Sequence, residues 1–250
     1  MTDEYGFDAS WSDEQRRLAL LERCWNPPTI ANLQQTGVGP GWHCLEVGAG
    51  NGSIARWLRD AVKPNGRIVA VDLDTRFIAN EPGIEARKAN ILTDEIETEA
   101  FDLVHCRALL HHLPGNEVAA LDRMKATLRP GGFVVAEEPY SGAMLGSRTP
   151  AWAALWRAFV GAMPHADYTW PLQIGAAFHA AGLTDIEVSG AADMVRGGTP
   201  SAEFLRLTVE AVRSRLAPGA DIEAGIQLLR DPGSFEPGFV VYCASGRRLA

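Results

Sequence analysis

The sequence predicts a single α/β domain built on a doubly wound, mostly parallel sheet. An apolar run over residues 42–47 is followed by three glycines at every second position, Gly48, Gly50 and Gly52, and then by a helical segment. Segments of strand and helix character go on alternating along the chain. Such alternation forms a parallel sheet with helices on both faces. A glycine turn between strand and helix lets a ligand approach the backbone closely.

The composition narrows the class of protein. The chain has 250 residues, 46% hydrophobic and 22% charged, which is typical of a soluble globular protein with a large core. Its formal net charge of −8 disfavours a nucleic-acid partner, because phosphate backbones are bound mostly by lysine and arginine. The four cysteines form no C-x-x-C pair, and no apolar run reaches membrane-spanning length. We therefore expect a cytoplasmic protein with reduced thiols, no metal and no membrane partner.

Two helices are predicted before the sheet, within residues 1–41. Leu18, Leu21 and Trp25 form one apolar stripe, which indicates the first helix. Asn26-Pro27-Pro28 is predicted to end it, because proline lacks the N–H that a helix interior needs. A second short helix follows to Gln35. Both helices lie outside the sheet pattern, so we expect residues 1–41 to form a helical lid.

Residues 42–138 carry the regular part of the pattern. The predicted strands cover residues 42–47, 67–71, 84–88, 101–107 and 133–137, with helices over 54–62 and 117–128. The carboxyl ends of parallel strands face one crevice, where ligands bind. Asp72 ends the second strand 20 residues after Gly52, where a Rossmann-type unit has an acid for ribose hydroxyls. We therefore expect residues 42–138 to bind a nucleotide-like cofactor.

Residues 139–250 complete the sheet and add helices. The expected helices cover residues 149–163, 171–181, 201–216 and 221–229, and the expected strands cover 183–188 and 238–244. Trp152, Trp156, Phe159 and Met163 lie on one helical stripe, which we interpret as facing the core. The alternative is a wall of a ligand pocket, since aromatic surfaces line small-molecule sites.

The stretch Glu46-Val47-Gly48-Ala49-Gly50-Asn51-Gly52 resembles the first motif of the class I S-adenosylmethionine-dependent methyltransferases, an acid followed by G-x-G-x-G. Residues 101–114 and 129–137 resemble the fourth motif and the fifth strand of that family. The resemblance implies a seven-stranded Rossmann-like sheet of order 3-2-1-4-5-7-6 with the last strand antiparallel. It also implies methyl transfer from S-adenosylmethionine, with S-adenosylhomocysteine as product. Glu46 suits this cofactor, which carries an ammonium and a sulfonium, whereas a pyrophosphate would be repelled.

The resemblance places cofactor contacts on the glycine loop and on the ends of the neighbouring strands. The residues are Glu46, Gly48, Ala49, Gly50, Ser53, Asp72, Leu73, Asn90, Ile91 and Cys106. Leu73 would cover one face of the adenine. Asn90 stands where the family usually has an acid, and its amide oxygen can accept one hydrogen bond from the adenine amino group.

Three residues are candidates for a general base. His111 follows the fourth strand, His165 lies in a polar and aromatic loop, and Glu138 comes just after the fifth strand. An imidazole has an unperturbed pKa of about 6.5, which suits proton transfer at neutral pH. A packing histidine is the simpler interpretation of His111, and an acceptor that is already ionised would need no base.

The predicted partner is a small, partly apolar acceptor, for example a natural product of secondary metabolism, held between the lid and residues 139–250. The methylated atom is left open among oxygen, nitrogen and carbon, and a homodimer is also left open. Three alternatives stand beside this function. They are an NAD(P)-dependent oxidoreductase, an S-adenosylmethionine-binding protein that has lost or changed methyl transfer, and a nucleic-acid methyltransferase.

Overall fold

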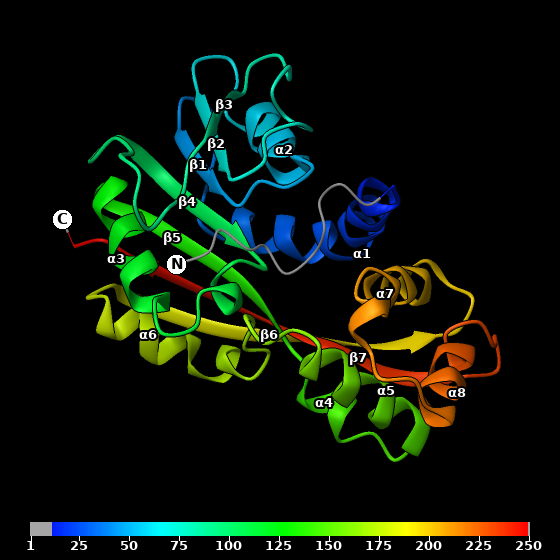
Figure 1. The fold of residues 1–250 in the computed structure, drawn as a ribbon. Helices are drawn as coiled ribbons and strands as arrows, with labels where there is room; N and C mark the ends of the chain where they lie inside the picture. Colours follow the sequence, from blue (N-terminus) through cyan, green and yellow to red (C-terminus); the bar gives the residue numbers. More distant parts are fainter. Residues whose placement is uncertain (1–11, 250) are drawn as a thin grey trace.

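The structure, a computed structural model, describes residues 12–249 and places them in one seven-stranded sheet with helices on both faces (Figure 1). The strand order is β3-β2-β1-β4-β5-β7-β6, so the predicted fold class and order are confirmed. The strands are β1 (His43–Val47), β2 (Arg67–Asp72), β3 (Glu85–Lys88), β4 (Phe101–Arg107), β5 (Leu128–Tyr140), β6 (Thr184–Arg196) and β7 (Phe235–Arg247). Strand β7 is antiparallel to both of its neighbours, and the other pairs are parallel.

Helices of very different lengths connect these strands. The α-helices are α1 (Glu14–Gln35), α2 (Ser53–Ala61), α3 (Glu117–Thr127), α4 (Gly142–Leu145), α5 (Pro150–Gly161), α6 (Ile174–Ala180), α7 (Pro200–Glu210) and α8 (Ala220–Leu228). The single-turn 3-10 helices are η1 (Leu110–His112), η2 (Trp170–Gln173) and η3 (Arg213–Arg215). None of the helices within residues 12–249 is long and apolar enough to cross a membrane.

The two faces of the sheet carry separate apolar cores. On one face, Leu33 of α1 and Leu58 of α2 pack with Cys44 and Val135 of the strands. On the other face, helices α3 and α6 pack against Val134 and its neighbours. Successive residues of a strand point to opposite faces. A polar side chain in β1, β4 or β5 therefore points to the same face as the apolar residues two positions before and after it.

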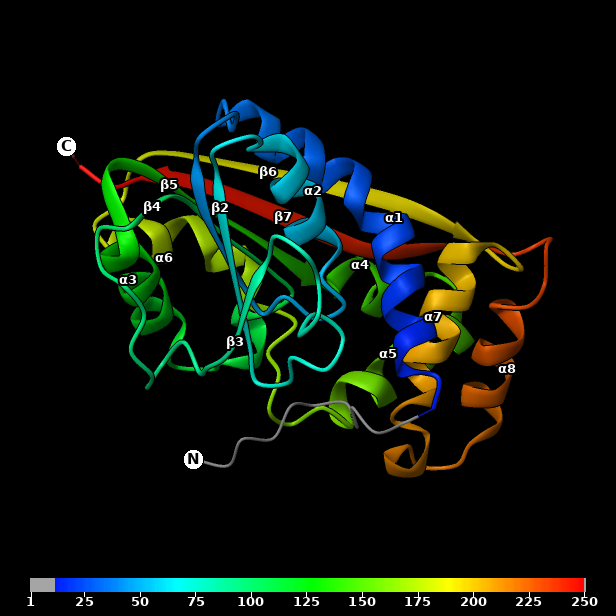
Figure 2. The same ribbon diagram turned by 90° about the horizontal axis from the view of Figure 1, so that it is seen from above.

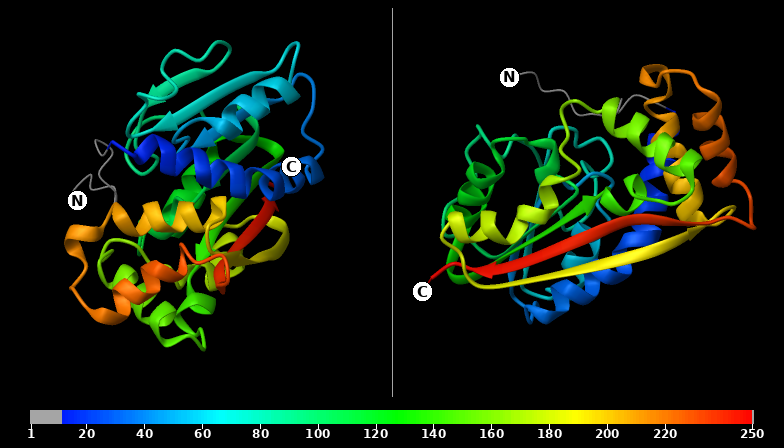
Figure 3. Two further views of the ribbon diagram at one scale, coloured as in Figure 1. Left: turned by 90° about the vertical axis from the view of Figure 1, so that its right-hand side faces the viewer. Right: turned by 90° about the horizontal axis from the view of Figure 1, so that it is seen from below.

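Strands β6 and β7 are longer than the sequence predicts, with 13 residues each. They extend side by side beyond the rest of the sheet, and helices α4, α5, α7 and α8 lie at their far end (Figure 3). A third apolar core holds these helices together. Trp152, Trp156 and Phe159 are fully buried in it, so the core-facing interpretation of that stripe is confirmed. The strands continue because antiparallel pairing and this core extend beyond the apolar runs that mark them in the sequence.

Helix α1 corrects the prediction of two N-terminal helices. It runs unbroken through Pro27 and Pro28 and lies beside α7 (Figure 2). Proline inside a helix costs hydrogen bonds, but packing holds both halves of α1. Trp25 meets Phe204 of α7 with ring centroids 5.5 Å apart, and Leu33 is buried under the sheet. Residues 1–11 of the predicted lid lie outside the described residues.

Candidate active site

The glycine loop after β1 has the shape that a cofactor cradle requires. Gly48, Gly50 and Gly52 have φ values of 72°, 54° and 80°, in the left-handed region that favours glycine. A Cβ on Gly52 would lie 2.4 Å from a methyl group of Ile78, so only glycine fits there. A Cβ on Gly50 would meet no atom within 4 Å, so the space over Gly50 is open. The loop thus offers backbone to a ligand.

Asp72 lies against this loop, at the end of β2. Its Oδ2 accepts a hydrogen bond from the Gly50 N–H at 2.8 Å, and its Oδ1 accepts one from Asp74 at 2.9 Å. Burial raises the pKa of Asp72, and the backbone N–H groups oppose that shift. The neighbouring Leu73 is 39% exposed, which leaves its side chain available to a ligand. A carboxylate and an apolar side chain beside an open loop fit the ribose and adenine of the expected cofactor.

The other predicted cofactor residues divide into two groups. Asn90 Oδ1 accepts a hydrogen bond from the Leu92 N–H at 2.9 Å, so this oxygen already takes part in a turn. Ser53 Oγ donates to Asn26 at 3.1 Å and joins α2 to α1. Ile91 and Cys106 bury their side chains in the core on the α3 and α6 face. We therefore expect any contact of these two residues with a cofactor to come from their backbones.

Glu46, the acid of the glycine motif, has a partner that the sequence analysis missed. The Nδ1 of His105 on β4 lies 2.8 Å from Glu46 Oε2. The Nε2 of the same ring lies 3.7 Å from Glu137 Oε2 on β5. All three side chains are at most 4% exposed. A histidine therefore links two carboxylates that approach from the strands on either side of it.

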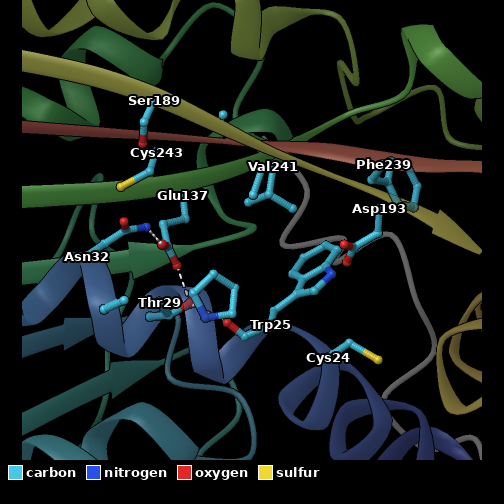
Figure 4. Close-up of a pocket in the computed structure, with 14 residues that line it drawn as sticks. Cys24, Trp25, Thr29, Asn32, Glu137, Ser189, Asp193, Phe239, Val241 and Cys243 are labelled. Atoms are coloured by element: carbon cyan, nitrogen blue, oxygen red, sulfur yellow. Dashed lines mark hydrogen bonds between the residues drawn. The ribbon is translucent and has the colours of Figure 1, made fainter.

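Helix α1 packs over Glu137 and donates hydrogen bonds to its carboxylate. Thr29 Oγ1 donates to Glu137 Oε2, and Asn32 donates to Glu137 Oε1 at 2.6 Å (Figure 4). Arg107 in turn donates to Thr29 at 2.9 Å. A cavity of about 190 Å³ lies next to Glu137, between α1 and the strands β6 and β7. The second half of α1 is thus fixed to the sheet through one buried carboxylate.

A second carboxylate–histidine pair joins two of the predicted base candidates. Glu138 is fully buried and accepts hydrogen bonds from the backbone N–H groups of Leu109, Leu110 and His111, at 3.0, 2.7 and 3.2 Å. The His111 ring places its Nδ1 2.6 Å from Glu138 Oε2. A carboxylate with these donors is an acceptor, so Nδ1 carries the proton and Nε2 keeps a lone pair.

The surroundings of His111 are mostly aromatic. The Tyr168 ring lies 4.8 Å away and the His112 ring 4.0 Å away, between centroids. The Asp167 N–H donates to the His111 carbonyl at 2.7 Å and fixes the loop that carries Tyr168. Burial, His111 and Arg17 hold the pKa of His112 well below its usual value. Loop residue His165 is exposed, and its side chain makes no hydrogen bond to His111 or Glu138.

Residues His105, Glu137, Thr29, Asn32 and Arg107 were not among the predicted site residues. The available signal was a histidine and a glutamate inside otherwise apolar strands, because buried polar groups need partners. Their partners lie 59 to 108 positions away in the chain. Within residues 12–249, no cluster of three or more His, Cys, Asp or Glu is arranged to hold a metal ion.

The fold and the glycine loop are those expected of a methyltransferase, and the comparisons with known proteins agree. Residues 11–188 match a family described as a methyltransferase domain. The chain therefore belongs to this methyltransferase family, and the predicted family resemblance is confirmed. The prediction of S-adenosylmethionine as cofactor agrees with that membership.

Individual relatives are similar to only part of this chain. A methyltransferase of Mycobacterium tuberculosis, itself named as uncharacterized, is 37% identical over 122 residues, 45% of this chain and 59% of that protein. The chain spans between 31% and 59% of the length of the curated relatives that it matches.

Solved structures share the fold at low identity. Phosphoethanolamine N-methyltransferase 2 of Haemonchus contortus, solved with phosphomonomethylethanolamine and S-adenosylhomocysteine, has a TM-score of 0.60 at 19% identity. That match covers 90% of this chain and 53% of the other. The 4+2 cyclase SpnF has a TM-score of 0.52 at 14% identity, covering 99% and 85%. The same fold thus carries different reactions.

Proposed function

We propose that this protein transfers a methyl group from S-adenosylmethionine to an oxygen, nitrogen or carbon nucleophile of a small, partly apolar acceptor. The observation that carries the proposal is the His111–Glu138 pair, in which a buried carboxylate fixes the imidazole at 2.6 Å. His111 lies in η1, shortly after β4, whose carboxyl end faces the cofactor crevice in this fold, and Glu138 lies on β5. A base near the crevice is what an acceptor with a removable proton requires.

Four residues would hold the cofactor. Gly48 and Gly50 would provide backbone contacts, with open space over Gly50, while Asp72 would provide the carboxylate for the ribose hydroxyls and Glu46 the charge for the ammonium group. When bound, the cofactor supplies a methyl group on a sulfonium sulfur whose leaving group is neutral. The protein's main task is then to align that methyl group with the nucleophile.

His111 would take the proton of the acceptor. Its Nε2 holds the lone pair because Nδ1 donates to Glu138. Glu138 fixes the ring in this tautomer and stabilises the imidazolium that forms, much as the carboxylate does in a Ser-His-Asp triad. Glu138 itself already accepts four hydrogen bonds, which favours His111 over Glu138 as the base.

The surroundings support an acceptor with an apolar part. Tyr168 stacks on Phe239 with centroids 5.8 Å apart, and Trp25 of α1 lies against the same Phe239. A wall of this kind favours planar or aliphatic groups over highly charged ones. The lid of residues 1–41 stays a prediction, in which α1 would take part through its first half.

Calorimetry tests the cofactor assignment. S-adenosylmethionine and S-adenosylhomocysteine should bind, and NAD should not. The Asp72→Ala variant should bind S-adenosylhomocysteine more weakly by roughly 1–3 kcal/mol, the scale of a lost hydrogen bond to a charged group. Binding of NAD without binding of S-adenosylhomocysteine would overturn the proposal.

A changed reaction on the same cofactor is the second candidate, because the cyclase SpnF shares this fold. Methyl-labelled S-adenosylmethionine separates the two. The label should pass to members of a panel of phenols, alcohols and amines under methyl transfer. A protein that binds the cofactor tightly and labels no member of a panel broad enough to include its acceptor performs another reaction.

A further inference from the structure

The imidazole of His105 is an unusual buried group. Its side chain has no exposed surface, and it lies between two carboxylates. The Nδ1 is within hydrogen-bond distance of Glu46, at 2.8 Å. The Nε2 is 3.7 Å from Glu137, too far for a hydrogen bond, and has no other partner among the described residues. One side of the ring is therefore satisfied and the other is not.

The groups packed around His105 set its charge. Glu46 on β1 and Glu137 on β5 are negative, and Arg107 on β4 is positive. Thr29 and Asn32 on α1 are neutral, and Glu22 on the same helix acts on Arg107. Burial raises the pKa values of the nearby thiols of Cys44, Cys106 and Cys243, so these stay neutral. Within residues 12–249, the two carboxylates next to the ring thus face one permanent cation.

A proton on His105 supplies the second positive charge. Burial disfavours the imidazolium, but Glu46 and Glu137 outweigh burial and raise the pKa of His105 to about 9. The free protein at neutral pH therefore has a neutral cluster of two carboxylates, one guanidinium and one imidazolium. Any further cation brought to Glu46 would disturb this balance.

We infer that His105 is a positioning residue that exchanges a proton for the ammonium group of the cofactor at Glu46. The imidazolium holds the Glu46 carboxylate in place while the site is free, and it releases its Nε2 proton to solvent when the ammonium arrives. The inference rests on the proposed function, because it requires that the amino-acid end of the cofactor reach Glu46.

Electrostatics gives the physical reason. Two cations that share one buried carboxylate repel each other strongly, because the protein interior screens charge poorly. Loss of the Nε2 proton removes this repulsion and keeps the cluster neutral. The remaining proton stays on Nδ1, where it makes the 2.8 Å hydrogen bond to Glu46. Protons and ligand then compete, so binding must tighten as the pH rises.

The experiment measures proton release on binding of S-adenosylhomocysteine, which has the ammonium group but no sulfonium. Calorimetry at pH 7.5 in buffers of different ionisation heat should show release of up to about one proton. The affinity should rise by up to about tenfold per pH unit between about pH 6.5 and 8.5. The control ligand 5′-methylthioadenosine lacks the amino-acid end and should bind without proton release.

A variant assigns the proton to His105. His105→Asn keeps an N–H donor for Glu46 but cannot titrate, so it should bind S-adenosylhomocysteine with no proton release and no rise with pH. His179→Asn, an exposed change on α6, should behave as the wild type. Should His105→Asn fail to fold, the comparison of the two ligands on the wild type still decides.

Two outcomes overturn the inference. One is binding of S-adenosylhomocysteine with no more proton release than 5′-methylthioadenosine shows. The other is unchanged proton release in His105→Asn. Failure of both ligands to bind is a different result, which would overturn the proposed function and this inference with it.

Discussion

Two carboxylate–histidine pairs lie on opposite faces of the same sheet, and different kinds of groups surround them. Glu46–His105 is on the α1 face, where a second carboxylate and side chains of a helix surround it. Glu138–His111 is on the other face, where three backbone N–H groups donate hydrogen bonds to the carboxylate. Glu137 and Glu138 are adjacent in sequence, and strand alternation sends one to each pair.

The difference shows what each imidazole is able to do. His105 lies between two negative groups, so its proton is strongly held and its role is electrostatic. His111 has one carboxylate on Nδ1 and aromatic rings around it, and its Nε2 is the atom that we propose as the base. Under the proposed function, the same two residue types would provide an exchangeable positive charge beside the cofactor and a base beside the acceptor.

The largest expected effect tests the role of His111. His111→Asn keeps a donor for Glu138 but removes the Nε2 lone pair, so turnover should fall by roughly 10²–10⁴-fold. Affinity for S-adenosylhomocysteine should stay nearly unchanged. His165→Ala is the matched comparison and should keep its rate. Equal rates in both variants and the wild type would mean that catalysis here is by proximity alone.

Glu138→Gln should have a smaller effect on the same pair. A glutamine amide can donate to Nδ1, which moves the ring proton to Nε2 and blocks the base. We expect a loss of about 10- to 100-fold in turnover, the scale of losing a group that orients a functional imidazole. The acid limb of the pH–rate profile should shift or disappear. An unchanged pH–rate profile would show that Glu138 has no part in the reaction.

The pH dependence of stability tests the other pair. The raised pKa of His105 contributes stability that is fully present below about pH 6.5 and is lost as the pH rises through about 9. Between pH 7 and 9.5 the free energy of unfolding should fall by on the order of 2 kcal/mol more in the wild type than in His105→Asn. Urea unfolding of both proteins at the two pH values measures this difference. Parallel losses would show that His105 is neutral in the free protein.

The smallest expected effect concerns the fixation of α1. Asn32→Ala removes the 2.6 Å hydrogen bond to Glu137 and should lower the free energy of unfolding by about 1.5 kcal/mol, as for other hydrogen bonds to charged groups. Gln35→Ala, an exposed change near the end of the same helix, is the control. If both variants lose equally little stability, Thr29 alone fixes the helix to the carboxylate.

Much of the fold could be predicted because its signals are local. The glycine loop, the apolar strands and Asp72 are recognisable from their immediate neighbours, and the order of the sheet follows from the family resemblance. The two prolines misled the prediction of α1, because the contacts that outweigh them come from α7 and from the sheet. The far ends of β6 and β7 were missed for a similar reason, since a separate helical core supports them.

The sequence by itself determined the class of protein, the cofactor loop and a set of candidate bases. Only the tertiary structure decided how those residues pair. It joined His111 to Glu138 and gave Glu46 a histidine partner from another strand. The physical reason is that a buried charge needs its partners within a few ångströms, and in this chain most of those partners are tens of residues away in sequence.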